Sequence, residues 1–190
     1  MTRQIFPLHI QRGTTLLEVL VTIVILAIGL LGLAGLQARL QSSEMEAYQR
    51  AQALVLINDM ASRIATNRSN AADYVTGSGN PLGAGMTCPA ATAAQQGRDA
   101  REWCEALQGA GESLAGSNVG AMVGGRGCVE VIPSIPGAYL VTVAWQGLTP
   151  ISAPGSVCGQ GLYNGASGSA CIGDLCRRVI TTIVRIGDLT

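Results

Sequence analysis

The sequence has 190 residues and no formal net charge, because 12 basic side chains balance 12 acidic ones. This balance gives no electrostatic basis for nucleic-acid binding, and the length suits one anchor and one modest domain. All basic side chains are arginine and the single histidine, His9, lies close to the N-terminus. Lysine chemistry and a histidine-activated nucleophile in a folded domain are thereby excluded, so we expect no enzymatic activity and no cofactor.

The chain begins with a short basic segment followed by a long apolar one. Residues 1–13 contain Arg3 and Arg12 and no acid, and residues 19–38 contain no charge at all. Twenty residues at about 1.5 Å each span about 30 Å, the thickness of the hydrocarbon core of a bilayer. Since basic residues flank the cytoplasmic end of a membrane helix, we expect a single pass through the inner membrane, with residues 1–13 in the cytoplasm and the chain beyond about residue 40 in the periplasm.

The junction between these segments resembles the cleavage signal of type IV prepilins. In that family a basic leader ends in Gly, and the mature chain is a hydrophobic helix with Glu as its fifth residue. Here Gly13 ends the leader and Glu18 is the fifth residue after it, while Thr14 stands where the family usually has Phe or Met. The resemblance implies cleavage by prepilin peptidase between Gly13 and Thr14, followed by N-methylation of Thr14.

An acid at the start of an apolar helix also needs a physical reason. A charged side chain at the centre of a membrane helix costs about 2.5–3.5 kcal/mol, and less near the edge, where Glu18 lies. A partner charge would offset this cost, and the resemblance to pilins supplies the mature N-terminal amine of a neighbouring subunit. Glu18 is therefore predicted to act in subunit docking; the alternative is an acid tolerated at the membrane interface.

The helix is predicted to continue beyond the membrane, because residues 41–68 contain neither Pro nor Gly. Apolar residues three or four positions apart predict a buried stripe made of Leu40, Ala47, Ala51, Leu54, Ile57, Ala61 and Ile64. Two pairs of opposite charge, Glu46 with Arg50 and Asp59 with Arg63, are predicted on the exposed side. An apolar stripe in water does not stabilise a lone helix, so a downstream domain must pack on it.

Residues 69–190 are predicted to form a disulfide-containing periplasmic head. Residues 69–97 are rich in Gly, Pro and small polar residues, which indicates a loop, and residues 98–107 predict a short helix. Alternating apolar residues predict antiparallel strands at residues 128–132, 138–146 and 177–186. The expected fold is therefore α+β and pilin-like: a long N-terminal helix, with a transmembrane part (14–40) and an amphipathic part (41–68), packed on a small antiparallel sheet.

The strand pattern also predicts which side chains face the core. Much of the buried face of the sheet is expected to come from Val141, Val143, Trp145, Ile180 and Val184. Arg178 and Arg185, in the last strand, are expected at the surface. In the predicted short helix, Trp103 and Leu107 share one face.

All six cysteines lie beyond the membrane segment, at Cys88, Cys104, Cys128, Cys158, Cys171 and Cys176. An even number in an oxidising compartment predicts disulfides, and six cysteines allow 15 connectivities. We expect Cys88 to pair with Cys104, and Cys158 to pair with either Cys171 or Cys176. A zinc site is the alternative, which the lack of a CxxC pair and of a histidine in this region disfavours, so we expect no metal.

Two stretches narrow the resemblance within the pilins. ILAIGLLGLAGLQ in the membrane part and NDMASRIATNR in the amphipathic part resemble the V-type minor pilins of the type IV pilus, the pilus modification proteins. The resemblance implies a structural subunit that joins other minor pilins, primes pilus assembly at the tip, and supports adhesion and twitching motility. The implied partners are prepilin peptidase, other minor pilins and the major pilin, with a tip adhesin as a further candidate.

Two other functions remain open from the sequence. A minor pseudopilin of a type II secretion system shares the N-terminal signal, and a membrane-anchored periplasmic binding domain needs only the anchor. The large Cys-rich domain and the NDMASRIATNR stretch favour the pilus over the secretion system. Retention of residues 1–13 in cells with active prepilin peptidase would instead favour the binding domain.

Overall fold

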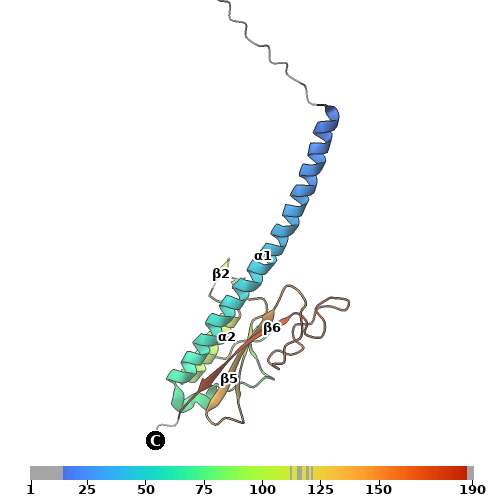
Figure 1. Ribbon diagram of the computed structural model, residues 1–190. Coiled ribbons are helices and arrows are strands. Elements are labelled where there is room, and N and C mark those ends of the chain that lie inside the picture. Colours follow the sequence, from blue (N-terminus) through green and yellow to red (C-terminus); the bar gives the residue numbers. More distant parts are fainter. Residues whose placement is uncertain (1–14, 112, 115–116, 119, 121, 188–190) are drawn as a thin grey trace, which may run out of the picture. The chain divides into compact units, whose positions relative to one another are not determined.

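The structure is a computed structural model, which describes residues 15–111, 113–114, 117–118, 120 and 122–187. The chain divides into two compact units, residues 1–43 and residues 44–190, and we call the second one the head unit. Helix α1 (Leu16–Thr66) begins in the first unit and ends in the head unit, and Figure 1 draws it as one unbroken helix. This is the long N-terminal helix predicted from the sequence.

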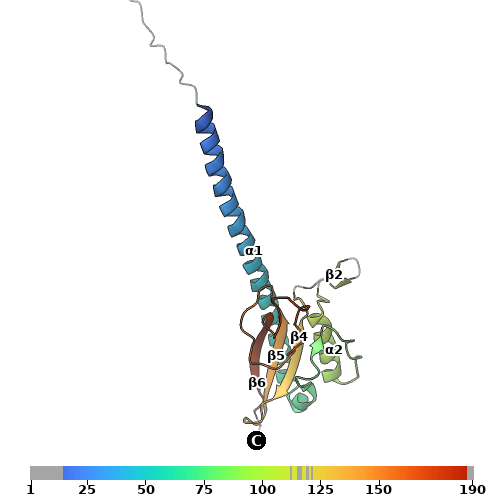
Figure 2. The ribbon, with the colours of Figure 1, turned by 90° about the vertical axis from the view of Figure 1, so that its right-hand side faces the viewer.

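The head unit contains a four-stranded antiparallel sheet with the strand order β1-β4-β5-β6. Its strands are β1 (Leu82–Gly83), β4 (Arg126–Val131), β5 (Ala138–Gln146) and β6 (Arg177–Arg185). The remaining elements are the 3-10 helix η1 (Arg68–Tyr74), helix α2 (Gln95–Leu107) and two short strands that pair with each other, β2 (Ser113–Leu114) and β3 (Ser117–Asn118). Figure 2 shows β4, β5 and β6 side by side, with α2 next to β4.

The predicted α+β, pilin-like fold is confirmed: a long N-terminal apolar helix packs with its C-terminal part on a small antiparallel sheet. Strand β5 has the predicted bounds, and α2 begins three residues earlier than predicted, at Gln95. Strand β1 and helix η1 lie in a segment that was predicted to be loop. Two-residue β1 is too short to show a period. Glycine is required at position 83, because its φ is 114° and a Cβ atom there would lie 2.4 Å from the Gly125 carbonyl oxygen.

The buried stripe of α1 in the head unit differs from the predicted one. It consists of Gln49, Ala53, Ile57, Met60 and Ile64, spaced three or four residues apart. Ile57 and Ile64 are buried as predicted and Ala61 is half-buried, whereas Leu40, Ala47, Ala51 and Leu54 are exposed. The prediction was wrong there because it followed apolar residues alone, and the face that meets the sheet includes the polar Gln49.

One face of the sheet packs against α1 and α2 to form the core. The core joins these residues from seven elements: Ala53, Ile57, Met60, Ile64, Ala71, Tyr74, Leu82, Trp103, Cys104, Leu107, Val129, Val141, Val143, Trp145 and Val184. Four of the five predicted sheet residues are buried here, and the fifth, Ile180, is half-buried against them. Trp103 is fully buried and its indole N–H donates to the Leu56 carbonyl at 2.9 Å. A buried tryptophan removes about 150–250 Å² from water, equivalent to about 4–6 kcal/mol.

The opposite face of β5 is covered by the long connection between β5 and β6, residues 147–176. Thr142 and Ala144 alternate with the core residues Val141 and Val143, so they point to this second face, and both are fully buried. Cys128, the partner of Thr142 in the sheet register, is bonded to Cys158 of the connection. A loop therefore forms the second layer of the head unit on this side.

Two charges of the head unit lie where the sequence did not predict them. The Arg178 side chain is only 11% exposed, and its Nη2 lies 3.1 Å from Oε1 of Glu46, so Glu46 pairs with β6 rather than with Arg50. The same Glu46 oxygen accepts the N–H of Leu148 at 3.1 Å. Burial by itself raises the pKa of Glu46, but Arg178 and the hydrogen bonds from Leu148 and Thr149 outweigh it and lower the pKa. The stability that Glu46 contributes is therefore present near neutral pH and is lost as the pH falls below 4.5 and through the lowered pKa.

Candidate functional site

The first candidate site is the apolar segment of α1, residues 15–41. In the part of the chain that the structure describes, α1 is the one helix long and apolar enough to cross a membrane. Every side chain of this segment is exposed in the isolated chain. An apolar surface of this size is covered by lipid or by other chains in a stable protein. The segment therefore fits a membrane-anchored protein.

Glu18 lies in the first turn of α1. Its backbone N–H donates to the carbonyl oxygen of Thr15 at 3.0 Å and is 3.3 Å from the Thr15 hydroxyl. Among the ion pairs of the described residues, none includes the Glu18 carboxylate. Gly13 and Thr14, the predicted cleavage position, lie outside the described residues, so cleavage, methylation and the docking role of Glu18 stay predictions.

Three glycines give the apolar segment a face of small residues. Gly29, Gly32 and Gly35 recur every three positions, and a Cβ atom added to any of them would meet nothing within 4 Å. No contact inside the described chain therefore requires glycine at these positions. Small residues let membrane helices approach each other closely, so this face is suited to a neighbouring helix.

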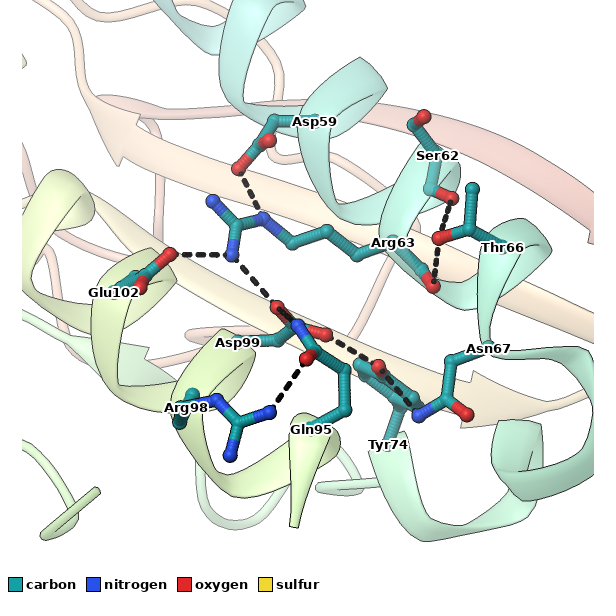
Figure 3. Close-up of polar contacts among 10 residues, drawn as sticks. All are labelled: Asp59, Ser62, Arg63, Thr66, Asn67, Tyr74, Gln95, Arg98, Asp99 and Glu102. Atoms are coloured by element: carbon teal, nitrogen blue, oxygen red, sulfur yellow. Dashed lines mark hydrogen bonds and ion pairs between the residues drawn. The ribbon is translucent and has the colours of Figure 1, made fainter. Parts of the chain in front are cut away.

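In the head unit, a polar network ties the end of α1 to α2 and η1 (Figure 3). The Arg63 guanidinium makes three ion pairs: Nε with Asp59 at 2.9 Å, and Nη1 with Asp99 at 2.9 Å and with Glu102 at 2.7 Å. Burial by itself lowers the pKa of Arg63, but Glu102, Asp59 and Asp99 outweigh it and raise the pKa. The predicted pair of Asp59 with Arg63 is confirmed. Asp99 and Glu102 of α2 also bind the Arg63 guanidinium, so one cation is surrounded by three carboxylates.

Asp99 is the buried centre of this network. Its carboxylate accepts the Tyr74 hydroxyl at 2.5 Å and the Gln95 amide at 2.9 Å, while Asn67 donates to the Tyr74 oxygen at 3.0 Å. Burial, and then the hydrogen bond to Asp99, raise the pKa of Tyr74 to about 12. The network therefore holds α1, η1 and α2 against one another through side chains from all three helices.

We expect the Tyr74 hydroxyl to remain protonated to unusually high pH. Its pKa is raised from 10.0 to about 12, so its contribution to stability is complete below pH 10 and is lost between about pH 10 and 12. The ultraviolet absorbance of phenolate in the protein minus that in Tyr74→Phe should show a transition near pH 12. Tyr74→Phe should also lower the free energy of unfolding at neutral pH by about 1–3 kcal/mol, because it removes a donor from a charged group. A difference transition near pH 10 would show that the hydrogen bond to Asp99 does not form.

The structure forms three disulfides from the six cysteines: Cys88–Cys104, Cys128–Cys158 and Cys171–Cys176. The first is the pair expected from the sequence. The expectation for Cys158 was wrong, because it assumed a partner nearby in the chain, whereas the fold places Cys158 over β4. Cys171 and Cys176 instead close a small loop with each other. In the described part of the chain, no group of three or more His, Cys, Asp or Glu side chains is arranged to hold a metal ion.

The connection between β5 and β6 is organised around Arg177, whose side chain is only 1% exposed. Its guanidinium donates to the carbonyl oxygens of Ser156 at 2.6 Å, Cys158 at 3.0 Å and Pro154 at 3.1 Å, and its Nε lies 3.4 Å from Asp174. Asp174 in turn accepts the N–H of Gly161 at 2.9 Å. The buried Arg177 side chain thus cross-links several parts of the connection between β5 and β6, whose described residues contain no helix or strand.

Nothing in the local sequence marks Tyr74, Arg177 or Asp99 as network residues. Tyr74 lies in a segment predicted to be loop, and Asp99 carries only a helix-start signal. Arg177 stands next to Arg178, which is also mostly buried but has a different partner, Glu46. Their partners are 25 residues away for Tyr74 and Asp99, and 36 residues away for Arg63 and Asp99. Such contacts have no short-range signature.

Taken together, the head unit and the helix that leads into it define a pilin-like α+β architecture, with a long apolar N-terminal helix and a small antiparallel sheet. The prokaryotic N-terminal methylation motif matches residues 8–34, a range that includes Gly13, Thr14 and Glu18. The match supports a type IV pilin-type protein, a structural class, and implies processing by prepilin peptidase. Searches of curated proteins and of solved structures found no match to the chain.

Proposed function

We propose that the chain is a minor pilin of a type IV pilus, a structural subunit that helps to prime pilus assembly at the tip and thereby supports adhesion and twitching motility. The observation that carries the proposal is the methylation motif at residues 8–34, which overlaps the start of α1. The resemblance of two stretches of α1 to V-type minor pilins supports the finer assignment.

The apolar segment has properties that suit both a lipid bilayer before assembly and the interior of a filament after it. Its uncovered side chains suit lipid while the protein waits in the inner membrane, with the leader in the cytoplasm and the head unit in the periplasm. The open face at Gly29, Gly32 and Gly35 then suits close contact with neighbouring helices in a filament. Other minor pilins and the major pilin are the proposed neighbours, with a tip adhesin as a further candidate.

Processing is the first test of this proposal. In cells with active prepilin peptidase, mass spectrometry of the purified chain should show a mature N-terminus at Thr14, carrying one methyl group. A pull-down from membranes should then recover other minor pilins. Retention of residues 1–13 would contradict the pilin assignment. Recovery of secretion pseudopilins in place of pilins would instead assign the chain to a type II secretion system.

Glu18 gives a second test. Glu18→Ala should leave membrane insertion intact but reduce incorporation into sheared pili by at least about tenfold, since 1.4 kcal/mol corresponds to a factor of ten and a desolvated ion pair contributes more than this. Immunodetection in membrane and pilus fractions measures both effects. The matched control is Glu44→Ala, which removes an exposed acid from the same helix. Equal incorporation of the two variants would show that Glu18 does not act in docking.

A further inference from the structure

A small pocket lies in the head unit at the edge of the sheet where β1 pairs with β4. Its volume is about 280 Å³, and it is lined by Gly79, Asn80, Pro81, Ala84, Gly85, Met86, Arg126 and Leu162. The lining therefore joins the β1 region, the first residue of β4 and the connection between β5 and β6. Ligand pockets begin at about 300 Å³, so this one suits a group of roughly the size of one amino-acid residue.

Arg126 is the charged group of the pocket, and it contacts two neutral groups, the Tyr163 ring and the Gly124 carbonyl. The centre of its guanidinium lies 5.0 Å from the centroid of the buried Tyr163 ring, and its Nη1 donates to the Gly124 carbonyl at 3.3 Å. The Tyr163 hydroxyl donates to the same carbonyl at 2.9 Å, which holds the ring in place. None of the six ion pairs of the described residues includes Arg126.

This absence distinguishes Arg126 from the other partly or fully buried arginines of the head unit. Arg63, Arg177 and Arg178 each pair with at least one carboxylate. Among the described residues, the half-buried Arg126 guanidinium contacts a ring and a carbonyl but no carboxylate, so an incoming anion would supply the counter-charge. An oriented guanidinium also binds carboxylates well, because its N–H groups match the two oxygens.

The rest of the lining narrows the kind of anion. Pro81, Ala84, Met86 and Leu162 are apolar, and among the described lining residues Asn80 is the one polar side chain beside Arg126. A sugar acid would leave several hydroxyl groups without partners among these residues, whereas an apolar amino-acid side chain would be covered by them. Gly85 keeps the approach open, since a Cβ atom there would lie 3.2 Å from Nη2 of Arg126.

We propose that this pocket binds the terminal carboxylate of a peptide that ends in an apolar residue, with the carboxylate on Arg126 and the apolar side chain against Leu162 and Met86. The pocket would give the head unit a binding function that is independent of its place in a filament. The proposal therefore does not rest on the pilus assignment, and it is tested on the isolated protein.

The test measures binding of N-acetyl-L-leucine to the full chain in detergent micelles by calorimetry and by nuclear magnetic resonance of the arginine side-chain N–H groups. The uncharged isostere N-acetyl-L-leucinamide and the sugar acid glucuronate are the comparison probes. We expect N-acetyl-L-leucine to bind at least about tenfold more tightly than the amide, since a hydrogen bond to a charged group contributes about 1.5–3 kcal/mol, and at ambient temperature 1.4 kcal/mol is tenfold. Glucuronate should not saturate the site.

Two variants locate the site. Arg126→Gln should weaken binding of N-acetyl-L-leucine at least about tenfold and abolish the preference for the carboxylate, whereas Arg185→Gln, at the exposed end of β6, should leave both unchanged. Leu162→Ala, at a position where the side chain is 51% exposed, should weaken the acid and the amide alike. Equal binding of acid and amide to the unmodified protein, tighter binding of glucuronate, or an unaltered affinity in Arg126→Gln would each overturn the proposal.

Discussion

Replacing Arg177 with methionine should destabilise the head unit by about 3–5 kcal/mol, because removal of one partner leaves a buried charge and buried acceptors unpaired. The lost contacts are those to three backbone carbonyls and to Asp174. Methionine has a similar length and no donors, so the change tests hydrogen bonding and charge rather than volume. Chemical unfolding of the full chain in micelles, followed by tryptophan fluorescence, reports on the head unit alone, since Trp103 and Trp145 both lie in its core.

The matched control is Arg185→Met, which removes a charge from an exposed position on the same strand. It should change the free energy of unfolding by less than about 0.5 kcal/mol. Hydrogen exchange should show faster exchange of the Gly161 amide in Arg177→Met, because Asp174 loses the cation that holds it. If the two variants unfold alike, the buried arginine does not organise the connection between β5 and β6.

Removal of the Cys128–Cys158 disulfide should have the second large effect. The bond joins residues 30 positions apart, and the entropy of closing a loop of this length corresponds to about 4 kcal/mol at 25 °C. The same relation gives about 3 kcal/mol for Cys88–Cys104 and about 2 kcal/mol for Cys171–Cys176, whose separations are 16 and 5. The double variant Cys128→Ala/Cys158→Ala should therefore lose most stability, measured by the same unfolding experiment.

Cys171→Ala/Cys176→Ala is the control for this series, because it removes a disulfide without detaching the connection from β4. Mass spectrometry of the non-reduced, digested protein checks the three pairings directly. A larger loss of stability in the Cys171/Cys176 variant than in the Cys128/Cys158 variant would contradict the proposed order. It would also show that the loop covering Thr142 is held mainly by other contacts.

Elements that depend on residues close together in the sequence were predicted correctly, whereas elements that depend on distant residues were not. Strand β5 has the predicted bounds because its alternation of residues is visible within nine positions. The predicted buried face of α1 was wrong at several positions, since the buried side of this helix depends on what packs against it and includes the polar Gln49 as well as Ile57. Strand β1 could not be predicted from two residues whose partners in the sheet, Arg126 and Gly127, lie more than 40 positions away.

The sequence by itself determined the long apolar helix and the N-terminal methylation motif at its start. Both are local: an uncharged run of twenty residues and a glycine five positions before a glutamate are read without knowledge of the fold. Only the tertiary structure decided which arginines are buried, which cysteines pair and where Arg126 meets an apolar pocket. The physical reason is that these features arise when segments distant in the chain meet, so that the partner of each group lies outside any sequence window.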